Sequence, residues 1–90
     1  MALDIRINKK FLKDLAQLPD GQRKKIEVFV FHEAKNFHSL SDIPSLRKLK
    51  GYKSYYRIRF GEYRVGLSIR NNVLTFERLL HRKDIYKYYP

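Results

Sequence analysis

The sequence contains no cysteine, and it has few acidic residues for its size: 9 Asp and Glu stand against 20 Lys and Arg in 90 residues. Without cysteine, the chain can form neither a disulfide nor a thiolate nucleophile. This composition fits a reducing compartment, and we expect a cytoplasmic protein.

Long hydrophobic runs are also missing. The most apolar stretch is VFVF at 28–31, which is far too short to span a bilayer. The first ten residues, MALDIRINKK, are charged from the fourth position and lack the apolar segment of a signal peptide. We therefore expect no membrane-inserted segment.

The motifs of several enzyme classes do not occur. The three histidines and nine acids show no zinc or calcium ligand spacing, and there is no Gly-rich phosphate loop, Ser nucleophile elbow or paired carboxylate arrangement. His32 falls in a predicted helix, where a structural role is favoured, and His38 falls in a loop. An enzyme built from this chain would need no metal or cofactor and would be rich in cations.

Positive charge is concentrated in the second half. The formal net charge is +11, of which residues 1–45 carry +2 (8 basic, 6 acidic) and residues 46–90 carry +9 (12 basic, 3 acidic). Such a field attracts polyanions. Nucleic acid is the leading class of partner, and an acidic protein or an anionic membrane surface are the alternatives.

The apolar periodicity predicts one domain over residues 1–90 with the order β-α-α-β-β-β. LDIRI at 3–7 alternates as a strand, Asn8 caps a helix that ends at Pro19-Asp20-Gly21, and a second helix covers 20–37. The apolar positions predicted to face the core of these helices are Phe11, Leu12, Leu15, Leu18, Ile26, Val28, Phe29, Val30, Phe31, Ala34 and Phe37.

Residues 55–60 and 63–69 alternate as two strands joined by a two-residue turn, Gly61-Glu62. That turn pairs Arg59 with Arg64 and Arg57 with Gly66, so the three arginines share one face. Asn71-Asn72 predicts a second turn leading to a strand at 73–80. A two-residue turn there sets Glu77 opposite Gly66, and a bulged turn reverses the faces.

The predicted fold class is α+β: a small antiparallel sheet with a helix hairpin on one face and a short helical turn near the C-terminus. The open face would carry the arginines. Like charges opposite each other destabilise a strand pair unless an anion lies between them, and the arginine fork suits phosphate. The alternative is a solvated sheet face covered by arginine stems.

The ending HRKDIYKYY adds His81, Arg82 and Tyr86 to this face. Histidine can transfer protons near neutral pH, and tyrosines between basic residues can stack on unpaired bases. Tyr88 and Tyr89 can equally serve to pack the tail on the sheet.

The segments KLKG, YRIRFGEYRV and HRKDIY, with the predicted element order, resemble the RelE/ParE superfamily of bacterial type II toxins over essentially the whole chain. The resemblance implies a toxin neutralised by a cognate antitoxin. RelE-like members enter the ribosomal A site and cut mRNA, leaving a 2′,3′-cyclic phosphate and a 5′-hydroxyl. ParE-like members share the fold and poison DNA gyrase.

The resemblance also implies roles for single residues. The predicted catalytic set is Arg57, Arg59, Arg64, His81, Arg82 and Tyr86, and the predicted RNA-binding set is Lys48, Lys50, Lys53, Tyr55 and Lys83. Arg57 and Arg59 stand where RelE carries two active-site lysines. Because arginine stays protonated, the general base would be His81, with Glu77 as the weaker candidate.

Three functions are therefore predicted in order of preference. The first is a ribosome-dependent mRNA endoribonuclease, the second a gyrase-inhibiting toxin without nuclease activity, and the third a non-toxic basic module that binds RNA or protein. For either toxin, the resemblance implies an acidic antitoxin in a hetero-oligomeric complex.

Overall fold

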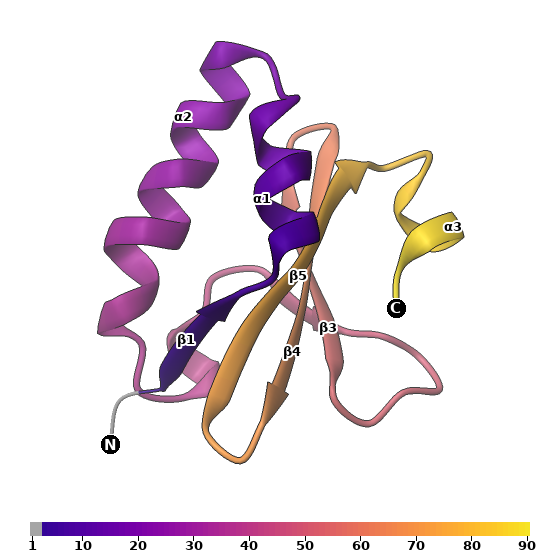
Figure 1. The fold of residues 1–90 in the computed structure, drawn as a ribbon. Helices are drawn as coiled ribbons and strands as arrows, with labels where there is room; N and C mark the ends of the chain where they lie inside the picture. The colour runs from indigo at the N-terminus through magenta and orange to yellow at the C-terminus, as the bar shows by residue number, and fades with distance from the viewer. Residues whose placement is uncertain (1–2) are drawn as a thin grey trace.

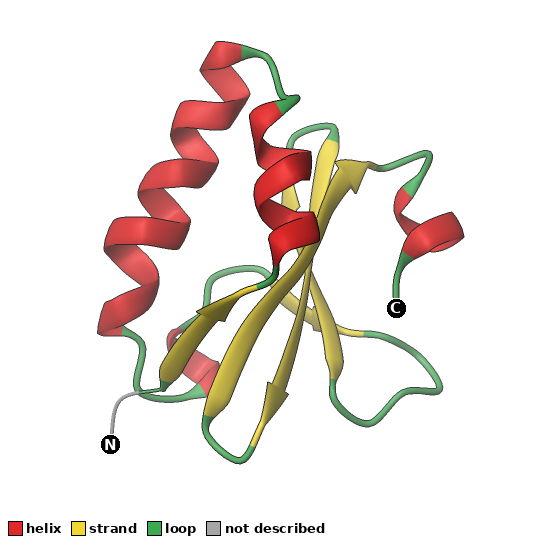
Figure 2. Ribbon diagram, in the orientation of Figure 1, coloured by secondary structure: helices red, strands yellow, loops and turns green. Residues whose placement is uncertain are grey.

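A five-stranded sheet forms the centre of the protein in the computed structural model, which describes residues 3–90 (Figures 1 and 2). Its strand order is β1-β5-β4-β3-β2. The strands are β1 (Asp4–Ile7), β2 (Leu46–Lys48), β3 (Tyr55–Phe60), β4 (Tyr63–Arg70) and β5 (Val73–His81). The helices are α1 (Lys9–Ala16), α2 (Asp20–Val28) and α3 (Ile85–Tyr88). The predicted α+β class is confirmed, and the predicted elements follow in the expected order, with β2 as an additional short strand before β3.

The pairing is mixed. Strands β2 to β5 pair antiparallel with their neighbours, whereas β1 adds to the edge of β5 in parallel. The expected antiparallel sheet thus describes four strands of the five. Alternation along 3–7 indicates a half-buried strand but carries no information about the direction of the strand beside it.

Helices α1 and α2 cover one face of the sheet, and α3 lies on the opposite side (Figure 1). Asn8 caps α1 by accepting a hydrogen bond from the Lys10 amide at 2.9 Å. The second helix extends past α2 through a π-helical turn at Phe29–Glu33 and a 3-10 turn at Ala34–Asn36. Its predicted extent is confirmed.

Three of the predicted core positions were wrong. Leu12, Val28 and Phe31 are 44%, 47% and 43% exposed. Each helix touches the core along one side, which other apolar side chains already fill. The buried helix residues are Phe11, Leu15, Leu18, Ile26, Phe29, Val30, Ala34 and Phe37.

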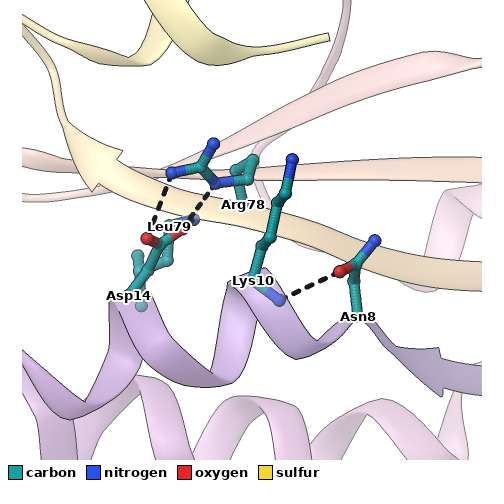
Figure 3. A network of polar contacts seen from close by, with 5 residues as sticks. All are labelled: Asn8, Lys10, Asp14, Arg78 and Leu79. Atoms are coloured by element: carbon teal, nitrogen blue, oxygen red, sulfur yellow. Dashed lines mark hydrogen bonds and ion pairs between the residues drawn. The ribbon is translucent and has the colours of Figure 1, made fainter.

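A buried ion pair joins α1 to the sheet (Figure 3). The Asp14 carboxylate accepts hydrogen bonds from Arg78 Nε at 2.8 Å, Arg78 Nη2 at 3.2 Å and the Leu79 amide at 2.9 Å. The bond to Asp14 is the largest effect on Arg78 and raises the pKa of its guanidinium. Three donors thus satisfy a carboxylate that would otherwise be costly to bury.

A smaller apolar cluster lies under the C-terminal helix. Leu49, Ile85 and Tyr89 are buried together, with Tyr55 and Leu80 packed against them. The cluster anchors α3 on the face of the sheet that α1 and α2 leave open. Within residues 3–90, no helix is long and apolar enough to cross a membrane.

Candidate functional site

The β3–β4 hairpin brings the three predicted arginines together. Its register pairs Arg57 with Gly66, Arg59 with Arg64 and Phe60 with Tyr63, as the two-residue turn predicts. Gly61 has φ +55°, which suits glycine at the first position of a II′ turn. The turn therefore determines which charges share the open face.

Five residues line a cavity of about 430 Å³ on this face, which we call the arginine cavity: Arg57, Arg64, Arg82, Lys83 and Tyr86. The first two come from the hairpin, the next two follow β5, and Tyr86 comes from α3. All four charged lining residues are cations. In the described part of the chain, no group of three or more His, Asp or Glu residues could hold a metal ion.

Arg64 is held in place before any ligand arrives. Its Nη1 donates to the carbonyl oxygens of Gly61 at 2.8 Å and Tyr63 at 3.0 Å. Burial, followed by repulsion from Arg59 and Arg57, lowers the pKa of Arg64. Arginine nevertheless stays charged at neutral pH, so the crowding favours binding of an anion that relieves the repulsion.

Arg82 is oriented by Glu62, a residue that the sequence analysis did not single out. Arg82 Nε lies 2.7 Å from Glu62 Oε2, and the Arg82 amide donates to the Glu62 carbonyl oxygen at 2.8 Å. The position of Glu62 in the hairpin turn, next to the arginines of β3 and β4, could have indicated that it contacts one of these cations. Its carboxylate partly offsets the charge at one end of the arginine cavity.

His81 is not part of the arginine cavity. It pairs with Tyr63 across β4 and β5, and the two rings meet edge to face at 5.6 Å. Its Nδ1 accepts a hydrogen bond from the Lys83 amide at 3.2 Å, and its Nε2 lies 3.9 Å from Glu62 Oε2. His81 and Arg82 both approach Glu62 Oε2, but Arg82 lines the arginine cavity whereas His81 packs against Tyr63. Arg59 is exposed beside Arg64 and does not line the arginine cavity either.

Glu77 also lies outside the arginine cavity. The Asn71-Asn72 turn has two residues, as predicted, but the register shifts between Gly66 and Leu67, so Gly66 pairs with Arg78. The bulge leaves Glu77 as the extra residue, and its Oε2 accepts a hydrogen bond from Ser68 Oγ at 2.8 Å. Of the two alternatives, the two-residue turn is the observed one, but the Gly66–Glu77 pairing that it implied does not form because a bulge lies within the strands, away from the turn.

The predicted RNA-binding residues fall into three positions. Lys83 lines the arginine cavity. Lys48 and Lys50 line an adjoining cavity that also contains Arg57 and Tyr86. Lys53 lines a third cavity, which shares Lys48 and Lys50 with that one. Tyr55 is half-buried, with its hydroxyl accepting a hydrogen bond from Arg70 Nη2 at 2.9 Å. It supports the surface and lines neither of the two cavities that contain Arg57.

Tyr89 fills the hollow left by Gly66. A Cβ built on Gly66 would lie 2.8 Å from three carbons of the Tyr89 ring. The Tyr89 hydroxyl lies 2.9 Å from the Tyr56 carbonyl oxygen and 2.6 Å from that of Leu67. Tyr88 and Tyr89 were predicted either to stack on bases or to pack the tail on the sheet. Tyr89 packs on the sheet, whereas Tyr88 is 60% exposed.

Comparison with known proteins finds similarity to toxins of toxin–antitoxin systems. Residues 5–86 match the family model described as "ParE toxin of type II toxin-antitoxin system, parDE". Toxin RelE3 of Methanocaldococcus jannaschii is 45% identical over 83 residues, which are 91% of this chain and 93% of that protein.

Solved structures agree with this. A toxin chain in the RelB–RelE antitoxin–toxin complex from Methanococcus jannaschii aligns with a TM-score of 0.79 and 42% identity, over 94% of this chain and 99% of that one. A mutant of E. coli toxin RelE in the free state aligns with a TM-score of 0.69 over 98% of this chain and 92% of that one. Because the identity is 17%, this match shows a similar fold alone.

Proposed function

Because this chain belongs to the RelE/ParE superfamily of type II toxins, we propose that it acts as a ribosome-dependent mRNA endoribonuclease that inhibits translation. The observation that carries the proposal is the arginine cavity, where Arg57, Arg64, Arg82 and Lys83 surround a space with Tyr86 at its side. Four cations around one space suit a phosphate whose negative charge increases during the reaction.

The reaction is a transesterification within the RNA chain. The ribose 2′-oxygen forms a bond to the adjacent phosphorus, and the bond from phosphorus to the 5′-oxygen of the next nucleotide breaks. The products are a 2′,3′-cyclic phosphate and a 5′-hydroxyl. Arg57, Arg64 and Arg82 stabilise the dianionic phosphorane, and Arg64 needs little reorganisation because the turn carbonyls already hold it.

The proton transfers fall to groups that line the arginine cavity. Tyr86 and Lys83 are the lining residues that can exchange a proton, since the other three are arginines. We assign proton transfer to this pair instead of His81, which faces Tyr63. Positioned acid–base catalysis is typically worth about 10²–10⁴-fold, so these two residues bear on rate more than on binding.

The partner of the free toxin is an acidic antitoxin. The similar M. jannaschii protein was solved as a RelB–RelE antitoxin–toxin complex. Here residues 46–90 carry a net charge of +9, which an acidic segment would neutralise. We expect a hetero-oligomeric complex that covers the arginine cavity or displaces α3.

Cleavage can be tested in a translating extract, with mRNA ends mapped by primer extension. We expect discrete cuts within translated codons, and about a 10²–10³-fold slower cleavage for Arg82→Ala because one stabilising cation is lost. Lys24→Ala removes the same charge from an exposed position on α2 and should cut normally. Unbroken mRNA with the wild-type protein, or full activity of Arg82→Ala, would contradict the proposal.

Gyrase inhibition is the second candidate, favoured by the ParE description of the matching family model. A DNA supercoiling assay with purified gyrase separates the two functions. Blocked supercoiling together with intact mRNA would identify the chain as a gyrase-directed toxin.

A further inference from the structure

A second cavity adjoins the arginine cavity. We call it the tyrosine cavity; it measures about 470 Å³ and is lined by Lys48, Leu49, Lys50, Tyr52, Arg57, Tyr86, Tyr89 and Pro90. Arg57 and Tyr86 line both cavities. A ligand that enters the tyrosine cavity would therefore lie directly beside a phosphate bound in the arginine cavity.

Tyr52 gives this cavity an exposed aromatic wall. Its side chain is 48% exposed, although its ring is held edge to face against Tyr55 at 5.8 Å. Tyr55 is held in the same way by the buried Tyr89 at 5.8 Å. This row of three rings orients Tyr52 while leaving a large apolar surface open to solvent.

Tyr86 supplies a second exposed ring from a different element. It is 60% exposed and lies on α3, which the fully buried Ile85 fastens to the sheet. Aromatic rings on rigid supports cost little entropy when they stack on a planar ligand. A volume of about 470 Å³ is within the range of small-molecule sites and accommodates a base with its ribose.

The charges of the tyrosine cavity select an anionic ligand. Lys48, Lys50 and Arg57 are cations, and no acidic residue is among the eight that line the cavity. Exposed rings interleaved with cations are the combination that binds unpaired nucleotides. An acidic peptide would satisfy the lysines but would make less use of two open aromatic surfaces.

We propose that the tyrosine cavity is a nucleobase subsite, in which Tyr52 stacks on the base of a nucleotide next to the phosphate in the arginine cavity. The inference rests on the proposed function and makes it more specific: the two cavities hold consecutive nucleotides of single-stranded RNA. Lys48 and Lys50 then contact the flanking phosphate.

The test measures binding of a fluorescent 2′-O-methyl tetranucleotide, which cannot undergo 2′-oxygen attack, by anisotropy. Four further probes each lack one base. Tyr52→Ala should weaken binding of the intact probe by about 5- to 150-fold, the loss of one base–aromatic stack. This penalty should disappear for one of the abasic probes and persist for the others, since the interacting base is then already missing.

Two controls separate stacking from loss of structure. Tyr52→Phe keeps the ring and should bind the intact probe within about twofold of wild type, because every base stacks on a bare ring. Tyr88→Ala removes another exposed tyrosine of α3 that lines neither cavity, and it should bind normally.

Three results would overturn the subsite. They are an unchanged affinity of Tyr52→Ala for the intact probe, an equal penalty on all four abasic probes, and a Tyr52 dependence seen with an oligoglutamate peptide but not with RNA. Because the readout is binding, its failure is distinct from that of the proposed function. Tyr52-dependent base binding without mRNA cleavage would leave the subsite standing and remove only the nuclease assignment.

Discussion

Asp14 shows how much a single polar residue contributes to the placement of the site. Its carboxylate on α1 holds Arg78 and the Leu79 amide of β5, three residues before Arg82. On the other side, the Arg78 guanidinium lies 5.7 Å from the centre of the Tyr88 ring on α3. One ion pair thus lies between the helix-covered face and the C-terminal tail.

Asp14→Ala should lower the free energy of unfolding by about 3 kcal/mol, because it leaves a largely buried guanidinium and a buried amide without their acceptor. Denaturant unfolding measures the change. Asp20→Ala is the matched control: it breaks the Arg23–Asp20 pair, whose aspartate side chain is 80% exposed, and should cost less than about 1 kcal/mol. Equal effects of the two substitutions would contradict the stabilising role given to the buried pair.

At the scale of elements, the two-residue turns could be predicted and the strand irregularities could not. Gly61-Glu62 determined the register that gathers Arg57, Arg59 and Arg64, and the structure has that register. The bulge near Glu77 could not be predicted from the sequence. Phe76 and Leu79 are both apolar, so a strand with or without the bulge would bury apolar side chains. The resemblance implied that His81 belongs to the site, but its ring packs on Tyr63 and does not line the arginine cavity.

The docking of α3 was equally hard to predict. A glycine in a strand signals a close approach without saying what approaches. Here the Tyr89 ring from the far end of the chain fills the space above Gly66. That contact depends on a tail conformation which a six-residue aromatic segment does not specify.

The packing of Tyr89, which follows α3, on the sheet should contribute less to the stability of the fold at high pH. Burial raises the pKa of Tyr89, whereas in the unfolded chain a tyrosine ionises with a pKa of about 10. The folded state therefore keeps a proton that the unfolded state releases. Stability from this group is fully present below about pH 10 and falls as the pH rises further.

Tyr89→Phe tests this directly. At neutral pH it should cost about 1 kcal/mol, the net value of a hydrogen bond. Above pH 10 the difference in the free energy of unfolding between wild type and Tyr89→Phe should become smaller, because only the wild type loses the contribution of the Tyr89 hydroxyl. Urea unfolding across pH 7–11 measures it, with Tyr88→Phe as an exposed control whose curve should run parallel to wild type. A difference in the free energy of unfolding that stays constant across this pH range would contradict a pKa of Tyr89 raised by burial.

At the scale of the whole molecule, the fold separates the helices of the first half from the two cationic cavities. The helices of the first half cover one face, and the open face presents a continuous series of basic side chains along both cavities: Lys48, Lys50, Arg57, Arg64, Arg82 and Lys83. This separation explains why the composition alone indicated a polyanionic partner. It also explains why charge could not specify the site, since Arg59 and Lys53 carry the same charge at its margins.

Binding of single-stranded RNA should therefore depend steeply on salt. If about five phosphates are neutralised along the two cavities, the logarithm of the affinity should fall with the logarithm of salt concentration with a slope of about −3.5, since each contact contributes about −0.7. Lys50→Ala should reduce the magnitude of the slope by about 0.7 and weaken all sequences alike, because the role proposed for Lys50 is a phosphate contact. Lys24→Ala, with the same change in net charge, should leave the slope unchanged, since that exposed lysine lies on α2. Equal slopes for Lys50→Ala and Lys24→Ala would mean that the overall net charge, and not the two cavities, holds the RNA.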